Sequence, residues 1–192
     1  MLINKLQALF HPEQYHGWGK TRKFFEGWYY KVVNTEETRA LAFIPGIAMD
    51  EKEAQRAFVQ VLDGKNLTSE YYSFGAQEFF PESGKFEIRL ANNFFSLEKL
   101  KLDLPAVQGE LHFDHLIPWP NRWYSPGVMG PFSFVPFMEC YHGVLSMDHT
   151  IQGRLTVGQE TIDFSNGRGY LEKDWGHSFP SAYIWIQTNH FN

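Results

Sequence analysis

Hydrophobic and polar positions alternate in short runs along most of the chain, and this two-residue period predicts β-strands. The runs are rich in aromatic and β-branched residues and are bounded by Gly, Pro, Asn or Asp. They cover residues 24–33, 39–44, 56–62, 71–74, 86–90, 107–113, 140–147, 150–157, 161–164, 168–174 and 182–190. Helical periodicity is weak and confined to residues 2–10 and 95–102. The pattern therefore predicts one all-β domain over residues 1–192, built as an antiparallel barrel or sandwich.

The last predicted strand, residues 182–190, is apolar, and the chain stops two residues beyond it. An unpaired apolar strand edge would favour aggregation. We therefore expect either that this strand closes a barrel or that further sequence follows it, and we favour the second. An unpaired strand here would also favour a homo-oligomer formed by pairing between chains.

One segment, residues 118–136, interrupts the strand pattern. It holds five of the ten prolines of the chain, and Trp119, Trp123, Tyr124, Phe132 and Phe134 lie between them. Proline removes backbone donors from a sheet, so the segment is predicted to be a long loop. Three interpretations stay open: a plug over one end of the barrel, an apolar lid over a lipophilic ligand, or a surface patch that contacts a membrane.

Composition narrows the function classes. The net charge is −5 and the pI about 5.9, with no basic stripe, so a nucleic-acid partner is not expected. The single cysteine, Cys140, excludes an internal disulfide framework and a cysteine-based zinc site. His112 and His115 would point to opposite faces of a strand, so no metal site is expected. No apolar run is long enough for a signal peptide or a membrane span, which favours a cytoplasmic protein and leaves peripheral membrane contact open.

Two predicted strands carry carboxylates next to aromatic residues. In residues 24–33, alternation places Glu26 on one face with Trp28 and Tyr30. Glu26 is therefore either paired with a cation, such as Arg168 or Lys173, or desolvated with a raised pKa. The first alternative is structural, and the second would suit an acid or a residue that orients a ligand.

In residues 168–175, Glu172 and Asp174 share one face, and Lys173 and Trp175 share the other. Alternation does not show which face points inward. If the carboxylates face inward, about 7 Å apart, one of them would stay protonated near neutral pH, as a general acid must. If they face outward, they form an ordinary solvated surface. His177 follows the strand and could relay a proton or bond the backbone.

Two motifs resemble a known family. Residues 24–31 (FFEGWYYK) and 169–180 (GYLEKDWGHSFP) are similar to the two signatures of the tocopherol cyclase family. Residues 182–189 (AYIWIQTN) resemble the next strand of that family. The E-G-W-Y and D-W-G elements are also similar to carotenoid hydratases and related lipocalin-like proteins. The resemblance covers essentially the whole chain, whereas family members continue through a second set of strands.

The resemblance implies a lipocalin-like (calycin-type) β-barrel, incomplete at the C-terminus, that works without a cofactor. An acid protonates the prenyl-tail alkene of a quinol, aromatic rings stabilise the cation, and a hydroxyl closes a chromanol ring. A hydratase would share the first step and let water trap the cation. The implied acids are Glu172 and Asp174, then Glu26, and His177 could orient the quinol or reprotonate the acid. The implied substrate-binding residues are Trp28, Tyr30, Trp175, Trp185, Trp119 and Trp123. Two alternatives remain, a non-catalytic carrier of an isoprenoid and a protein with a membrane-surface role.

Overall fold

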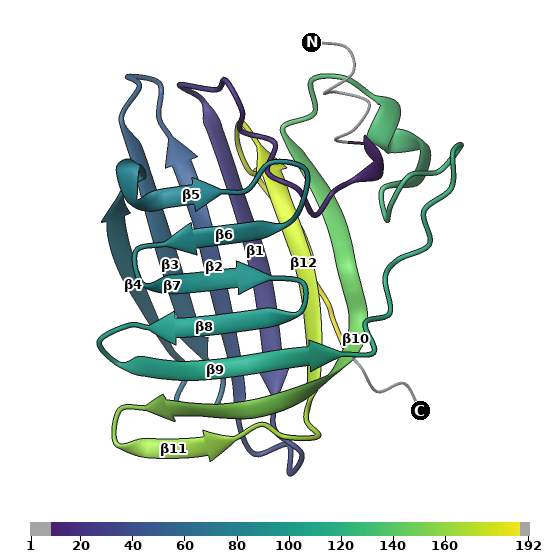
Figure 1. Cartoon of the computed structure of the whole chain (residues 1–192). Helices are drawn as coiled ribbons and strands as arrows, with labels where there is room; N and C mark the ends of the chain where they lie inside the picture. Colours follow the sequence, from purple (N-terminus) through teal and green to yellow (C-terminus); the bar gives the residue numbers. More distant parts are fainter. Residues whose placement is uncertain (1–8, 189–192) are drawn as a thin grey trace.

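The computed structural model describes residues 9–188, which form one antiparallel sheet of 12 strands (Figure 1). The strands are β1 (Phe24–Val33), β2 (Ala40–Met49), β3 (Gln55–Asp63), β4 (Thr68–Gly75), β5 (Phe79–Pro81), β6 (Glu87–Leu90), β7 (Asn93–Ser96), β8 (Lys99–Asp103), β9 (Val107–Asp114), β10 (Cys140–Val157), β11 (Glu160–Asp163) and β12 (Arg168–Gly176). Two short 3-10 helices, η1 (Ala76–Glu78) and η2 (Gly130–Phe134), complete the described elements. No helix among these residues is long and apolar enough to cross a membrane.

The sheet folds over on itself at β10, so that it forms two layers. The strand order is β4-β3-β2-β1-β12-β10-β9-β8-β7-β6-β5, with β11 paired to β10. The first half of β10 pairs with β12, its second half pairs with β9, and its register with β12 shifts around Ser146. Such irregularities let one strand bend from one layer into the next. In Figure 1, β5–β9 cross in front of the upright β1–β4 and β12. No ladder among residues 9–188 joins β4 to β5, so the sheet stays open.

The core lies between the two layers and is filled by aromatic side chains. Alternate residues of β1 point into it, and Trp28 and Tyr30 are fully buried. The Trp28 ring stacks on Phe86 at a centroid distance of 5.3 Å. The Tyr30 hydroxyl donates a hydrogen bond of 2.8 Å to the carbonyl of Ser96, which lies in the opposite layer. Large aromatic rings, whose polar atoms are hydrogen-bonded, therefore hold the two layers together.

The predicted all-β antiparallel class is confirmed, and three local predictions are wrong. Residues 95–102 are not helical, because Phe95 in β7 and Leu100 in β8 are buried on one sheet face. Residues 140–147 and 150–157 form the single strand β10, because its bulges absorb the irregular pattern between them. Residues 182–188 form no strand, and 189–190 lie outside the described residues. The predicted helix 2–10 lies mostly outside them as well.

Candidate functional site

The pairing of β1 with β12 separates the candidate acids onto two faces of the sheet. Trp28 lies opposite Lys173, and Tyr29 lies opposite Glu172. Because neighbouring residues in a strand point to opposite faces, Glu26 points inward with Trp28 and Lys173, whereas Glu172 points outward with Tyr29. The acids predicted from the sequence therefore belong to two different environments.

On the inner face, Glu26 forms an ion pair with Lys173, and both side chains are 0% exposed. The backbone N–H of His16 donates to both carboxylate oxygens of Glu26, at 2.9 and 3.0 Å. The Lys173 ammonium lies over the ring of Trp28 at 4.7 Å and over that of Trp175 at 4.9 Å. The structure combines the two alternatives for Glu26, because the carboxylate is paired with Lys173 and is also desolvated.

Burial governs the titration of this pair. It raises the pKa of Glu26, against the opposing effect of the Lys173 charge, and it lowers the pKa of Lys173 to about 8. The Lys173 ammonium also occupies the space between the rings of Trp28 and Trp175, two residues that the family resemblance implied would bind the substrate. In this structure Trp28 and Tyr30 are core residues, and the cation over the Trp28 ring is a lysine of the chain itself.

On the outer face, a second group of polar side chains forms what we call the outer-face cluster: Glu172, Tyr170, Asp174 and His142. Glu172 is only 4% exposed despite its position on the outside of the sheet. Its Oε2 accepts hydrogen bonds from the Tyr170 hydroxyl at 2.6 Å and from the Trp185 indole N–H at 3.2 Å. Burial raises the pKa of this carboxyl, and the bond from Tyr170 opposes the rise.

His142 of β10 lies between the two carboxylates of the cluster. Its Nδ1 is 2.8 Å from Asp174 Oδ1, and its Nε2 is 3.6 Å from Glu172 Oε2. Burial lowers the pKa of His142, but the hydrogen bond and charge of Asp174, with the charge of Glu172, outweigh it and leave the pKa raised. The charge of a protonated His142 lowers the pKa of Glu172, whereas the charge of Asp174 raises it. The raised pKa of Glu172 therefore comes mainly from burial.

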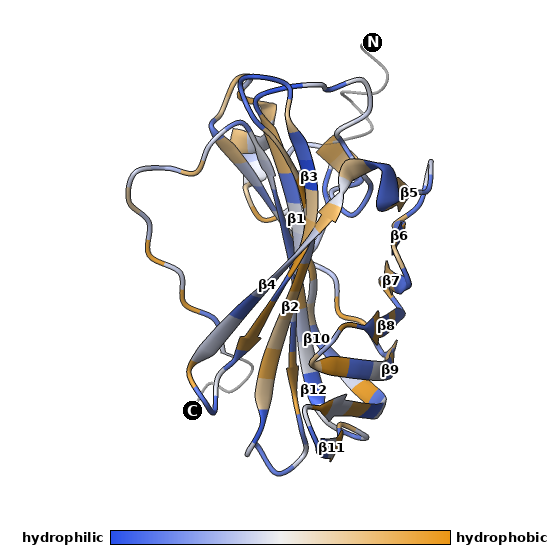
Figure 2. Ribbon diagram, turned by 90° about the vertical axis from the view of Figure 1, so that its left-hand side faces the viewer, coloured by the Kyte–Doolittle hydropathy of each residue, from blue (hydrophilic) through white to orange (hydrophobic). Residues whose placement is uncertain are grey.

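The chain after β12 covers the cluster. Residues 178–188 run along the outside of the sheet, on the side away from β5–β9 (Figure 2). The Trp185 ring meets Tyr29 edge-on at 5.4 Å, and the Phe179 ring stacks on Phe25 at 4.6 Å. This covering segment excludes water from Glu172, although it is irregular and its own side chains are largely exposed.

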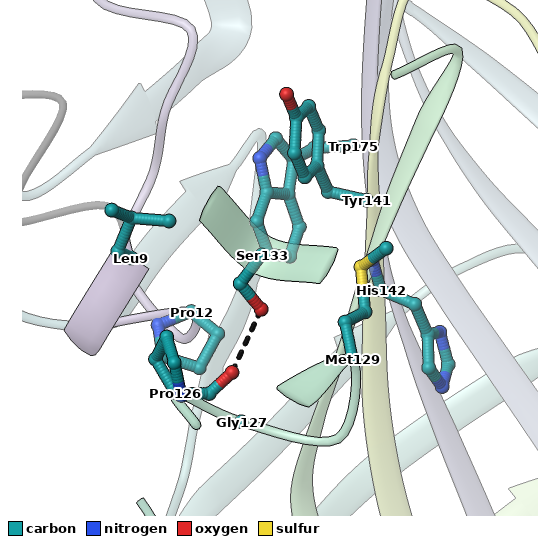
Figure 3. Close-up of a pocket in the computed structure, with 9 residues that line it drawn as sticks. All are labelled: Leu9, Pro12, Pro126, Gly127, Met129, Ser133, Tyr141, His142 and Trp175. Atoms are coloured by element: carbon teal, nitrogen blue, oxygen red, sulfur yellow. Dashed lines mark hydrogen bonds between the residues drawn. The ribbon is translucent and has the colours of Figure 1, made fainter. Parts of the chain in front are cut away.

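The other predicted residues lie elsewhere. His177 is exposed beyond the end of β12, with its Nδ1 3.3 Å from Ser178 Oγ. Trp119 and Trp123 belong to the β9–β10 loop (residues 115–139) and are 39% and 80% exposed. Trp175 helps to line a small hollow between this loop and the N-terminal segment. Figure 3 shows the hollow, in which the His142 ring is turned away from Leu9 and Pro12. His142 is a lining residue, but Glu172, Tyr170 and Asp174 are not.

Sequence reasoning missed the central place of His142 and Tyr170. Tyr170 is two residues before Glu172 in the same strand, so alternation already placed the two side chains on one face. His142 lies in the predicted strand 140–147, 32 residues before Asp174 in the sequence. Its place beside Asp174 depends on the register between β10 and β12, which no local pattern specifies.

Comparison with known proteins agrees with the motifs. Residues 107–192 match the family model described as tocopherol cyclase-like. The chloroplastic tocopherol cyclase of Zea mays is 26% identical to this chain, over 92% of this chain and 48% of its own length. A probable chloroplastic tocopherol cyclase of Oryza sativa subsp. japonica is also 26% identical, over 93% and 49%. The chain thus spans about half the length of the curated relatives it matches.

Solved structures resemble the fold alone. A putative AttH protein from Nitrosomonas europaea has a TM-score of 0.56 at 11% identity, over 82% of this chain and 53% of its own. CghA, solved with Sch210972, has a TM-score of 0.50 at 13% identity, over 81% and 46%. The antiparallel sheet, which is not closed among residues 9–188, and these neighbours are consistent with a lipocalin-like, calycin-type fold. The two signature motifs and these matches make the chain similar to tocopherol cyclase-like proteins, most directly over residues 107–192.

Proposed function

We propose that the outer-face cluster protonates an alkene in the prenyl tail of a lipophilic quinol and so closes a chromanol ring, with Glu172 as the acid. The observation that carries this proposal is a carboxyl that is 4% exposed, hydrogen-bonded by Tyr170 and Trp185, and raised in pKa by burial. A carboxyl that keeps its proton closer to neutral pH is what alkene protonation requires. The match of residues 107–192 to the tocopherol cyclase-like family model supports the reaction class.

The proposed reaction is an isomerisation and balances without an outside reactant. The Glu172 O–H proton forms a new C–H bond at one alkene carbon, and the other carbon becomes a tertiary cation. A quinol hydroxyl oxygen then forms the C–O bond of the ring. Its proton returns to the Glu172 carboxylate, which restores the acid for the next cycle.

The neighbours of Glu172 suit this sequence of charges. When Glu172 gives up its proton, the Tyr170 hydroxyl stays within 2.6 Å of the new carboxylate, and the His142 imidazole lies 3.6 Å away. Asp174 fixes the ring orientation of His142 through its bond to Nδ1, so we assign Asp174 a positioning role. The ring of Tyr29 lies on the same side, beneath Trp185, and its face would stabilise the cation once the indole is displaced.

Substrate access requires the covering segment to move. The Glu172 side chain is 6% exposed in this arrangement, and the Trp185 indole lies on it. The Trp185 bond of 3.2 Å is the longer of the two on Oε2, and the residues around Trp185 are irregular and exposed. We infer that the prenyl tail displaces the indole, so that substrate replaces Trp185 as the cover that keeps water from the acid.

The test is incubation of the whole protein with a prenylated quinol, followed by chromatographic detection of chromanol. Glu172→Gln should lower turnover by about 10²–10⁴-fold, the usual worth of a general acid, and leave ligand affinity nearly unchanged. Glu51→Gln is the matched control, because Glu51 is 78% exposed and lies in a turn. Full turnover in Glu172→Gln would refute the assignment. Tight binding of the quinol with no product from the wild-type protein would instead identify a non-catalytic carrier.

A further inference from the structure

The β9–β10 loop holds six exposed aromatic side chains that the proposed site does not use. Their exposed fractions range from 39% for Trp119 to 88% for Phe137. The six are Trp119, Trp123, Tyr124, Phe132, Phe134 and Phe137, which we call the loop patch. Scattered single apolar side chains are normal on a surface, but a contiguous stretch of chain with this many exposed rings marks an interaction site.

The loop has a defined conformation, so its exposed rings are not the consequence of an unfolded segment. Arg122 and Ser125 form an isolated β-bridge, and the Ser133 hydroxyl donates to the carbonyl of Pro126 at 2.8 Å. The Tyr141 hydroxyl at the start of β10 donates to the carbonyl of Val135 at 3.0 Å. These bonds hold the backbone of the loop while the rings point away from the protein core.

We propose that the loop patch docks the protein on the surface of a lipid bilayer, with its rings in the zone between headgroups and acyl chains. Trp and Tyr prefer this zone because each combines an apolar ring with a polar tip. Irregular, proline-rich backbone cannot enter the hydrocarbon core unsatisfied, so the loop would stay at the interface. This proposal rests on the loop alone and does not depend on the role of Glu172.

Charge and shape favour a bilayer over a protein partner. Arg122 is the only Lys, Arg, Asp or Glu within residues 115–138, and the chain has a net charge of −5. The patch therefore offers almost no charge pattern that a protein partner could read. In Figure 1 the loop projects from the side of the sheet beside β10, and a projection suits a planar, deformable surface better than a shaped groove.

Charge also predicts which lipids the patch should bind. Polybasic segments bind anionic membranes in a salt-dependent manner, and this loop has a single Arg. Because the rest of the protein is acidic, anionic lipid should not strengthen binding. We therefore expect binding to zwitterionic phosphatidylcholine vesicles that changes little between about 0.1 and 0.5 M salt, where electrostatic attraction would be screened.

The test is co-sedimentation of the protein with phosphatidylcholine vesicles. Trp123→Ser combined with Phe137→Ser removes the two most exposed rings, at 80% and 88%, and should weaken vesicle binding about tenfold or more. Leu67→Ser combined with Phe80→Ser is the matched control, because these exposed residues lie in a turn and in β5, away from the loop. It should bind as the wild-type protein does, and thermal unfolding should show all variants folded.

Three results would overturn the proposal. The first is wild-type protein that stays in the supernatant at every lipid concentration. The second is binding that needs anionic lipid and disappears at high salt. The third is a concentration-dependent dimer in sedimentation velocity that is lost in the Trp123→Ser and Phe137→Ser variant without any vesicle binding, which would assign the patch to a second copy of the chain.

Discussion

Replacing Lys173 by Met would leave Glu26 as a buried carboxylate without its ammonium partner. Both side chains are 0% exposed, and two tryptophan rings enclose the ammonium at 4.7 and 4.9 Å. Removing one member of such a pair costs about 3–5 kcal/mol, because the remaining charge stays buried. For a domain of this size, that corresponds to a fall of roughly 10 °C in Tm.

The pH dependence of this loss distinguishes an unpaired charge from a simple cavity. In the Lys173→Met variant, burial raises the pKa of Glu26 above its unfolded value, so the native state binds the extra proton. The carboxyl then destabilises the variant increasingly as pH rises above about 4.5, and the loss should be smaller at pH 4–5 than at pH 8. A cavity would give the same loss at every pH.

Urea unfolding monitored by circular dichroism measures the change, and the chain offers a matched control. Lys23 and Glu51 form an exposed pair, with side chains 59% and 78% exposed, and Lys23→Met should cost about 0–1 kcal/mol. If Lys173→Met lowers the free energy of unfolding no more than Lys23→Met does, the Glu26–Lys173 ion pair does not stabilise the sheet as described. If the loss of stability in Lys173→Met did not change with pH, the substitution would have removed only packing contacts.

Two further predictions concern histidine and tryptophan. Burial lowers the pKa of His149 to about 4, so folding excludes a proton that the unfolded chain binds. Stability should fall as pH drops from 6.5 to 4, by roughly 3 kcal/mol, and His149→Gln should flatten this part of the urea-denaturation profile. An equally steep profile in His149→Gln would be inconsistent with this role. Trp185→Phe removes an N–H donor to Glu172, so the pH at which chromanol formation declines should rise. If the pH midpoint of this decline stayed unchanged, Trp185 would have no influence on the pKa of Glu172.

Alternation along single strands predicted which side chains share a face. Glu26 does share a face with Trp28 and Tyr30, and Glu172 shares one with Asp174. The sequence could not show which face points inward, because that depends on the layer that covers each side. The N-terminal segment around His16 covers Glu26, and the irregular segment that carries Trp185 covers Glu172. Neither contact has a local signature in the sequence.

The errors in the fold have related physical causes. Residues 182–190 have the composition of a strand, but composition does not supply the partner that a strand needs, and residues 182–188 lie across the sheet instead of pairing with it. Residues 95–102 contain a tight hairpin between Phe95 and Leu100, and the spacing of the apolar residues across such a turn imitates a helical period. In both segments, the structure depends on which strands pair, and the sequence pattern of a single segment does not specify this.

The same long-range pairing assembled the outer-face cluster. His142 and Asp174 are brought together by the β10–β12 register, 32 residues apart in sequence. The family motif drew attention to Glu172 and Asp174, yet the histidine that touches Asp174 was not the nearby His177. Sequence proximity to a motif was therefore a weaker guide than strand register.

The central claim is that Glu172 delivers a proton to carbon, and isotope transfer tests it most directly. The wild-type protein and Glu172→Gln are incubated with a prenylated quinol in D₂O, and the product is returned to H₂O before mass spectrometry. We predict chromanol with one deuterium that does not exchange from the wild-type protein, because the Glu172 proton comes from solvent, and almost no product from Glu172→Gln. Unlabelled chromanol, or labelled chromanol formed equally fast by Glu172→Gln, would contradict the claim.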